Sequence, residues 1–173
     1  MKGDYARAQA DYDSVLRLDP KTSGIHFSRG RTLLYATDYA RAIDEFERAH
    51  KLEPTDYSAL WLYLARKRGG TTGAEGMLDE STRSSQRLGW PSAVIALYAG
   101  RTDVQSVMNA ATDNDPARQR DQRCEANFYV AQWHLIQGAT ERALPLLQEA
   151  ERGCPKHFLE YEGALAELRR LKR

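Results

Sequence analysis

The sequence has little net charge, no long apolar run and few cysteines. Each of these absences excludes a class of function. Its 25 Lys and Arg residues nearly balance its 24 Asp and Glu residues, which leaves a formal net charge of +1. Without an overall positive field, we expect no nucleic acid as partner. No apolar run approaches the roughly 18–20 residues that span a bilayer, and the first residues, MKGDYARAQADYD, hold no apolar signal core. We therefore expect no direct membrane insertion of this chain.

Patterns that carry catalysis or bind metals are missing as well. The four histidines are scattered without the spacing of paired ligands, and the two cysteines have no metal-type spacing. The glycine-rich stretch at residues 69–73 lacks the lysine and the spacing of a phosphate-binding loop. No Gly-x-Ser-x-Gly motif is present. We expect a protein that is not an enzyme, with no catalytic residues, no bound metal and no cofactor.

What the sequence does contain is an internal repeat. Residues 4–20 read DYARAQADYDSVLRLDP, and residues 38–54, 34 positions later, read DYARAIDEFERAHKLEP. Of the 17 aligned positions, 7 are identical and 5 more are conservative, among them Asp11/Glu45 and Tyr12/Phe46. A repeat of this length is typical of a solenoid of helix–turn–helix units. Such solenoids usually present binding surfaces.

The repeat predicts an all-α fold in a single domain, residues 1–173. The first repeated segment matches the second helix of the later unit, so the first unit is incomplete or the chain is a fragment. Pro155 lies 101 residues after Pro54, one residue short of three periods, so the register survives an irregular middle. The predicted segments are a partial repeat (1–20), a repeat (21–54), a degenerate repeat (55–88), a short irregular helix pair (89–115), a repeat (116–155) and a capping helix (156–173).

The pattern of small, aromatic and proline positions resembles the tetratricopeptide repeat consensus. The first complete unit matches it at Gly30, Ala42, Phe46, Ala49 and Pro54. The later unit matches it at Ala131, Ala143, Leu147, Ala150 and Pro155, with leucine in the aromatic position. His26 and Leu33 depart from the Trp and Tyr of that consensus. The resemblance implies a solenoid of antiparallel helix pairs with a C-terminal capping helix, which binds another protein or a peptide.

A narrower resemblance covers roughly residues 57–170. The stretches GWPSAVIALYAGR, ATDNDPARQR and EANFYVAQWHLIQG are similar to the C-terminal half of the bacterial NlpI-type tetratricopeptide repeat lipoproteins. This resemblance implies an adaptor at the outer membrane, facing the periplasm, whose partners are envelope hydrolases and a processing protease. The lipidated cysteine of that family has no counterpart in this sequence, so the resemblance does not imply membrane attachment here.

In such a solenoid the first helices of the units line the concave groove. Residues four apart form one stripe on each of these helices, and aromatic anchors beside arginine suit peptide binding. The alternative is that Phe27, Trp61 and Phe128 belong to the core between helices. The predicted groove residues are Phe27, Arg31, Tyr35, Trp61, Arg68, Phe128 and Gln132.

The cysteines form the last candidate feature. Cys124 begins one helix and Cys154 follows its antiparallel partner. Each helix has about 14 residues, or about 21 Å, so the hairpin returns the second cysteine close to the first. A disulfide is sterically feasible and indicates an oxidising compartment; two reduced thiols are the alternative.

These features predict a non-catalytic adaptor that holds a peptide or helix in its groove, in the bacterial periplasm or at the outer membrane. Two alternatives stay open. The first is a structural module that forms a homodimer through its incomplete first repeat. The second is a cytosolic scaffold, which applies if the cysteines are reduced.

Overall fold

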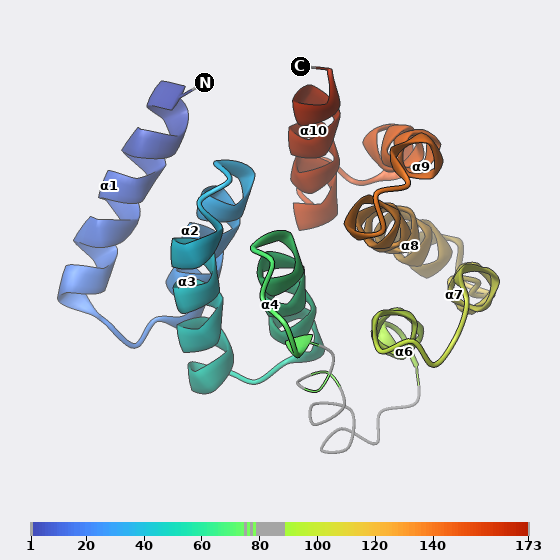
Figure 1. Cartoon of the computed structure of the whole chain (residues 1–173), viewed down its shortest axis with the longest axis horizontal. Coiled ribbons are helices and arrows are strands. Elements are labelled where there is room, and N and C mark those ends of the chain that lie inside the picture. Colours follow the sequence, from blue (N-terminus) through green and yellow to red (C-terminus); the bar gives the residue numbers. More distant parts are fainter. Residues whose placement is uncertain (1, 75, 77, 79–88, 173) are drawn as a thin grey trace. The chain divides into compact units, whose positions relative to one another are not determined.

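The computed structural model describes residues 2–74, 76, 78 and 89–172 (Figure 1). All regular secondary structure in these residues is helical, which confirms the all-α class. The chain divides into two compact units, residues 1–81 and 82–173, which are described separately below. The division falls inside the segment predicted as a degenerate repeat, and the second helix expected in that segment lies largely outside the described residues.

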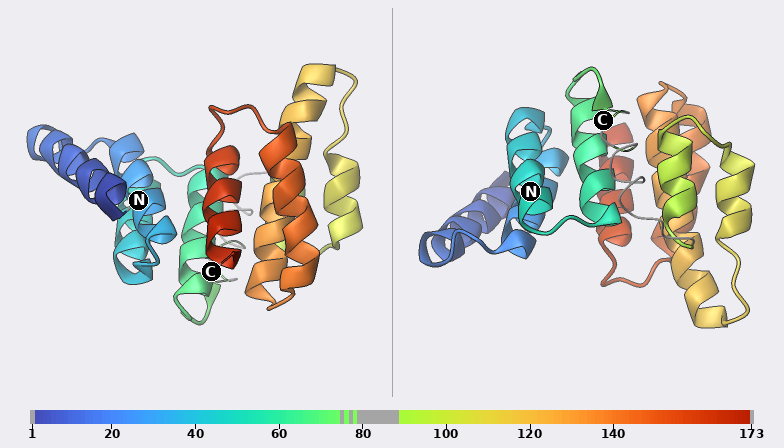
Figure 2. Two further views of the ribbon diagram at one scale, coloured as in Figure 1. Left: turned by 90° about the horizontal axis from the view of Figure 1, so that it is seen from above. Right: turned by 90° about the horizontal axis from the view of Figure 1, so that it is seen from below.

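Unit 1 contains α1 (Lys2–Leu18), α2 (Ser23–Tyr35), α3 (Tyr39–Leu52) and α4 (Asp56–Arg68). Each helix packs on the next one in the chain, and α2 also contacts α4. Figure 2 shows α2 and α3 side by side, joined by the short turn at residues 36–38. Successive antiparallel helix pairs are the architecture that the 34-residue period predicts.

The interface between α2 and α3 carries the packing that the repeat predicts. Ala42, Phe46 and Ala49 on α3 are all buried. Gly30 on α2 lies directly against the aromatic ring: a β-carbon added there would lie 2.9 Å from Cε1 of Phe46. A residue without a side chain at position 30 therefore lets the ring fill the seam between the two helices.

Side-chain caps begin several of the helices. Thr55 and Ser58 form a capping box at α4, in which the Thr55 hydroxyl accepts a hydrogen bond from the Ser58 backbone at 3.0 Å. The Asp38 carboxylate accepts a longer hydrogen bond, at 3.4 Å, from the backbone of Arg41 in α3. Such caps satisfy backbone N–H groups that have no partner within the helix, so they fix where each helix begins.

Unit 2 contains α6 (Ser92–Tyr98), α7 (Val104–Ala110), α8 (Pro116–Ile136), α9 (Thr140–Gly153) and α10 (Leu159–Leu171). The short helices α6 and α7 pack on each other and on α8, and α10 packs on both α8 and α9. On α9, Ala143, Leu147 and Ala150 are fully buried. They stand where Ala42, Phe46 and Ala49 stand on α3, so the packing of the repeat recurs in unit 2.

The two regular helix pairs also turn in the same way. Thr37 follows α2 with a φ of 63°, and Gly138 follows α8 with a φ of 74°. The left-handed backbone region is open to glycine but strained for a β-branched residue such as threonine. Thr37 therefore adopts the same left-handed backbone as Gly138 although threonine disfavours it, because the packing of α2 on α3 requires this turn.

Candidate protein-interaction surfaces

The predicted groove residues of unit 1 meet around one tryptophan. The ring of Trp61 on α4 lies 5.9 Å from the ring of Phe27 and 6.2 Å from that of Tyr35, both edge-on. The guanidinium carbon of Arg31 lies 6.0 Å from the centre of the Trp61 ring, at the outer limit of a cation–π contact. The stripe on α2 and Trp61 of α4 thus form one contiguous cluster.

Exposure separates these residues into two groups. Trp61 is fully buried and Arg31 is 9% exposed, whereas Phe27 and Tyr35 are half-buried. Phe27 also packs edge-on against Phe46, 5.5 Å away. Trp61 therefore acts as the packed base of the cluster, and the aromatic side chains of α2 supply its accessible part. Arg68 lies half-buried in the last turn of α4.

The remaining predicted groove residues lie in unit 2, on α8. Phe128 is 1% exposed and its ring lies 5.2 Å from that of Tyr129. The side-chain amide of Gln132 is buried too, and it donates to a carboxylate oxygen of Glu167 on α10 at 3.4 Å. Both side chains are buried in unit 2, and neither presents an accessible anchor.

The two cysteines are joined in unit 2. The sulfur atoms of Cys124 on α8 and Cys154 after α9 form a disulfide, with 4.8 Å between the Cα atoms. The expectation that Cys124 begins its helix is wrong, because α8 starts at Pro116 and Cys124 lies in its interior. Both residues are buried. The bridge links residues 30 apart in sequence and closes the α8–α9 hairpin at one end.

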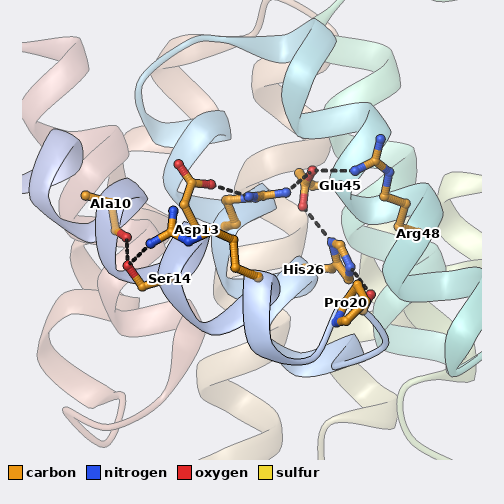
Figure 3. Close-up of polar contacts among 9 residues, drawn as sticks. Ala10, Asp13, Ser14, Pro20, His26, Glu45 and Arg48 are labelled. Atoms are coloured by element: carbon orange, nitrogen blue, oxygen red, sulfur yellow. Dashed lines mark hydrogen bonds and ion pairs between the residues drawn. The ribbon is translucent and has the colours of Figure 1, made fainter.

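A charged cluster that the sequence analysis did not single out lies between α1, α2 and α3 (Figure 3). The buried carboxylate of Glu45 on α3 is its centre. Arg29 donates to this carboxylate at 2.7 Å, and Nδ1 of His26 lies 2.8 Å from it. Arg29 also pairs with Asp13 of α1, so the cluster ties three helices together.

Both ring nitrogens of His26 face oxygen atoms of neighbouring residues. Its Nε2 atom lies 3.0 Å from the carbonyl oxygen of Pro20, and its Nδ1 atom faces the Glu45 carboxylate. The two contacts hold the ring between α3 and the turn that follows α1. The sequence contained one indication of this pair. His26 replaces the consensus tryptophan, and Glu45 stands at a position that is also acidic in the first repeated segment. The repeat alone, however, does not show that two polar side chains are in contact.

Electrostatics in the cluster favour the ionised carboxylate. Burial alone would raise the pKa of Glu45, but the hydrogen bonds from Arg29 and His26 outweigh it, and the pKa of Glu45 is lowered. The buried carboxylate and its donors depend on one another. Removing one donor would leave part of the negative charge buried without a partner, which destabilises the fold. The cluster therefore has the character of a structural clamp between helices.

The described residues also lack two features that would point to membranes or metals. Among the described residues, no helix combines the length and the apolar character required to cross a bilayer. The same residues contain no group of three or more His, Cys, Asp or Glu side chains arranged to hold a metal ion.

A comparison with known families identifies the repeat. The model of the tetratricopeptide repeat family matches the chain over residues 2–57 and again over residues 27–66. Residues 2–66 therefore match the tetratricopeptide repeat, as the spacing of their small and aromatic residues predicts. Repeats of this type generally mediate protein–protein interaction and are typically non-catalytic.

Proposed function

We propose that this protein is a non-catalytic adaptor that binds a peptide or a helix of another protein along α2. One observation carries the proposal: the Phe27, Arg31 and Tyr35 stripe converges on Trp61, with the two outer aromatic rings half-buried. Aromatic side chains that are held by packing yet partly accessible lose little conformational freedom on binding, so they serve well as anchors.

The disulfide supports a location for this adaptor. Disulfides persist in oxidising compartments such as the bacterial periplasm and are rare in the cytosol. The Cys124–Cys154 bridge and the resemblance of residues 57–170 to NlpI-type lipoproteins point in the same direction. We therefore extend the proposal to an adaptor of the bacterial envelope whose partners are a hydrolase or a protease.

The test uses peptides selected against the purified chain from a random phage-displayed library. Tyr35→Ala and Phe27→Ala should each weaken the binding of the selected peptides on the order of tenfold, since each removes one aromatic anchor. Arg31 is unsuitable for substitution, because it is nearly buried over Trp61 and its loss would perturb folding.

Tyr57→Ala is the matched control, because Tyr57 is an exposed aromatic residue of the same unit, at the beginning of α4. Circular dichroism melting shows whether each variant is folded. Selected peptides that bind the Tyr35 and Phe27 variants as tightly as the original chain would refute the proposed α2 surface.

A structural module that pairs through α1 is the second candidate. It is favoured by the exposed apolar residues Val15 and Leu18 near the C-terminal end of this helix. Light scattering separates the two candidates. A monomer whose mass does not change with concentration supports the adaptor, whereas a dimer that Val15→Glu dissociates supports the structural module.

A further inference from the structure

A pocket of about 460 Å³ lies in unit 1, where the C-terminal ends of α1 and α3 meet the first half of α2. We call it the helix-end pocket. Its apolar walls are Leu16, Pro20 and Leu52. Its polar walls are His26, Arg29, Arg48 and Lys51. Among the described residues, no acidic side chain lines it, so the pocket combines an apolar part with a cationic part.

The inner polar residues of the pocket already have partners. Arg29 pairs with Glu45 and Asp13. Figure 3 shows the ring of His26 with Glu45 on one side and Pro20 on the other. These contacts fix the floor of the pocket. The positive charge that remains available to a ligand therefore comes from the two outer cations, both on α3.

The outer cations are accessible. The side chain of Arg48 is 59% exposed and lies 3.5 Å from the Glu45 carboxylate, a longer contact than the 2.7 Å of Arg29. Lys51 is exposed in the last turn of α3 and makes no ion pair with another described residue. Leu52 follows it and is 42% exposed. A ligand that carries an anion beside an apolar group would cover all three side chains.

The packing of the repeat does not require this combination. The positions in unit 2 that correspond to Arg48, Lys51 and Leu52, 101 residues later, hold Glu149, Arg152 and Gly153. There the arginine and the glutamate pair with each other, and glycine has no side chain to offer. An exposed leucine beside two accessible cations is therefore a property of unit 1 alone among these two helix pairs.

We propose that the helix-end pocket binds an acidic segment of a partner protein, in which an apolar side chain stands next to an Asp or Glu. The apolar side chain packs on Leu16, Pro20 and Leu52. The carboxylate beside it pairs with Arg48, whose planar guanidinium can donate two parallel hydrogen bonds, and with Lys51, which adds a compact positive charge.

Charges next to the pocket disfavour an extended polyanion. Asp44 and Glu47 lie in an adjoining depression on α3 that shares Arg48 and Lys51 with the helix-end pocket. A nucleic acid or an anionic membrane presents many closely spaced negative charges, which would meet these carboxylates as well as the cations. A single carboxylate pairs with the cations without this repulsion.

The shape of the pocket favours a segment of a protein over a free small acid. Pro20, Lys51 and Leu52 are all exposed, so a small molecule held between them would keep part of its surface in water. Sites for small molecules usually enclose most of their ligand. A protein segment compensates for the open side, because it makes further contacts beyond the pocket.

This site is separate from the proposed α2 surface. With about 3.6 residues per turn, His26 and Arg29 lie on roughly the opposite side of α2 from the aromatic stripe. The stripe faces Trp61 of α4, whereas these two residues contact α3 and the residues of α1 and its following turn. The inference therefore does not depend on the proposed peptide surface.

The probes are two capped peptides, acetyl-Gly-Ser-Leu-Glu-Gly-Ser-amide and the same peptide with Gln in place of Glu. Capping removes the terminal charges, so the glutamate carboxylate is the only charge that differs. The intact chain is titrated and followed by NMR of its backbone amides. We expect the Glu peptide to shift the amides of Leu16, Lys51 and Leu52 in a saturable way. The Gln peptide should bind on the order of tenfold more weakly.

Substitutions in the chain assign the binding to the pocket. Arg48→Gln should weaken binding of the Glu peptide on the order of tenfold. Arg41→Gln is the matched control, because Arg41 is also an exposed arginine of α3 that pairs with an acidic residue three positions earlier, at 3.4 Å, and it does not line the pocket. Leu52→Ser should weaken binding, whereas Leu144→Ser, at a leucine of similar exposure (38%) on α9, should not.

A charge exchange makes the test specific. Lys51→Glu should abolish binding of the Glu peptide and create binding of a peptide with Lys in place of Glu. Tyr35→Ala should leave binding of the Glu peptide unchanged, which separates this site from the proposed α2 surface. Melting curves confirm that each variant is folded.

Three results would overturn the proposal. Equal binding of the Glu and Gln peptides would show that Arg48 and Lys51 are only solvated charges at a helix end. Isovalerate that binds as tightly as the Glu peptide would show that the pocket takes a free acid. A single-stranded oligonucleotide that displaces the Glu peptide from the original chain, but not from a chain with Arg48→Gln, would identify a polyanion as the ligand.

Discussion

At the scale of single residues, the contact between Gly30 and Phe46 shows how directly the repeat constrains side chains. The sequence predicts a small residue facing an aromatic one, and the structure places the ring where a β-carbon would collide with it. The buried pair of His26 and Glu45 lies beside this contact, and the sequence did not predict it. An apolar pattern reveals which residues are buried, but it does not reveal which buried polar groups find each other.

The first prediction concerns this glycine. Gly30→Ala should destabilise the protein by about 1–3 kcal/mol, because the methyl group forces Phe46 or the helix backbone to move. Gly24→Ala is the matched control on the same helix, since nothing lies within 4 Å of its added β-carbon. That change should be neutral or stabilise by up to about 1 kcal/mol. Urea unfolding measures both values, and equal effects at the two positions would contradict the packing described here.

At the scale of helices, the α8–α9 hairpin is held by two independent means. The buried face of Ala143, Leu147 and Ala150 packs on α8, and the Cys124–Cys154 disulfide closes one end. From the sequence, helix lengths place the cysteines near each other but leave the reduced form open. Their apposition in the structure depends on how α9 is rotated against α8, which the packing face sets.

The second prediction is that replacing both cysteines with serine destabilises this hairpin by about 3–4 kcal/mol, the chain-entropy value for a loop of this size. Hydrogen exchange should become faster in α8 and α9 while the exchange of α2 and α3 in unit 1 stays the same. Alkylation of protein from its native source, without reductant, provides the chemical check. Two free thiols in that experiment would show that the bridge does not form there.

At the scale of the whole molecule, a half-buried histidine in unit 1 and a buried one in unit 2 make stability depend on pH. Burial, with a smaller contribution from Arg66, lowers the pKa of His50, and burial together with Arg142 lowers that of His134. In the unfolded chain these rings take up protons near their ordinary pKa of about 6.5. The unfolded state therefore binds more protons than the folded state as the pH falls below that value, and the folded state loses stability.

The third prediction follows from this loss of stability at lower pH. The melting temperature should fall between pH 7.5 and pH 5.5, and the double variant His50→Gln with His134→Gln should show a smaller fall. His157→Gln is the control, because His157 is exposed. Glu45 has a lowered pKa in the folded state, so the folded state also loses stability when the pH falls below the ordinary pKa of a glutamate. A fall of equal size in all variants would show that these histidines do not cause it.

The sequence by itself determined the repeat architecture, because a 34-residue period, small residues at fixed positions and an aromatic seam have few structural solutions other than stacked helix pairs. It also identified the residues of the α2 stripe and the cysteine pair. Only the tertiary structure decided which of these are accessible. Trp61 and Phe128 are buried whereas Phe27 and Tyr35 are half-exposed, and Val15 is uncovered although its counterpart Ala49 is buried. The physical reason is that a period fixes which side of a helix a residue occupies, whereas exposure depends on whether another helix lies against that side.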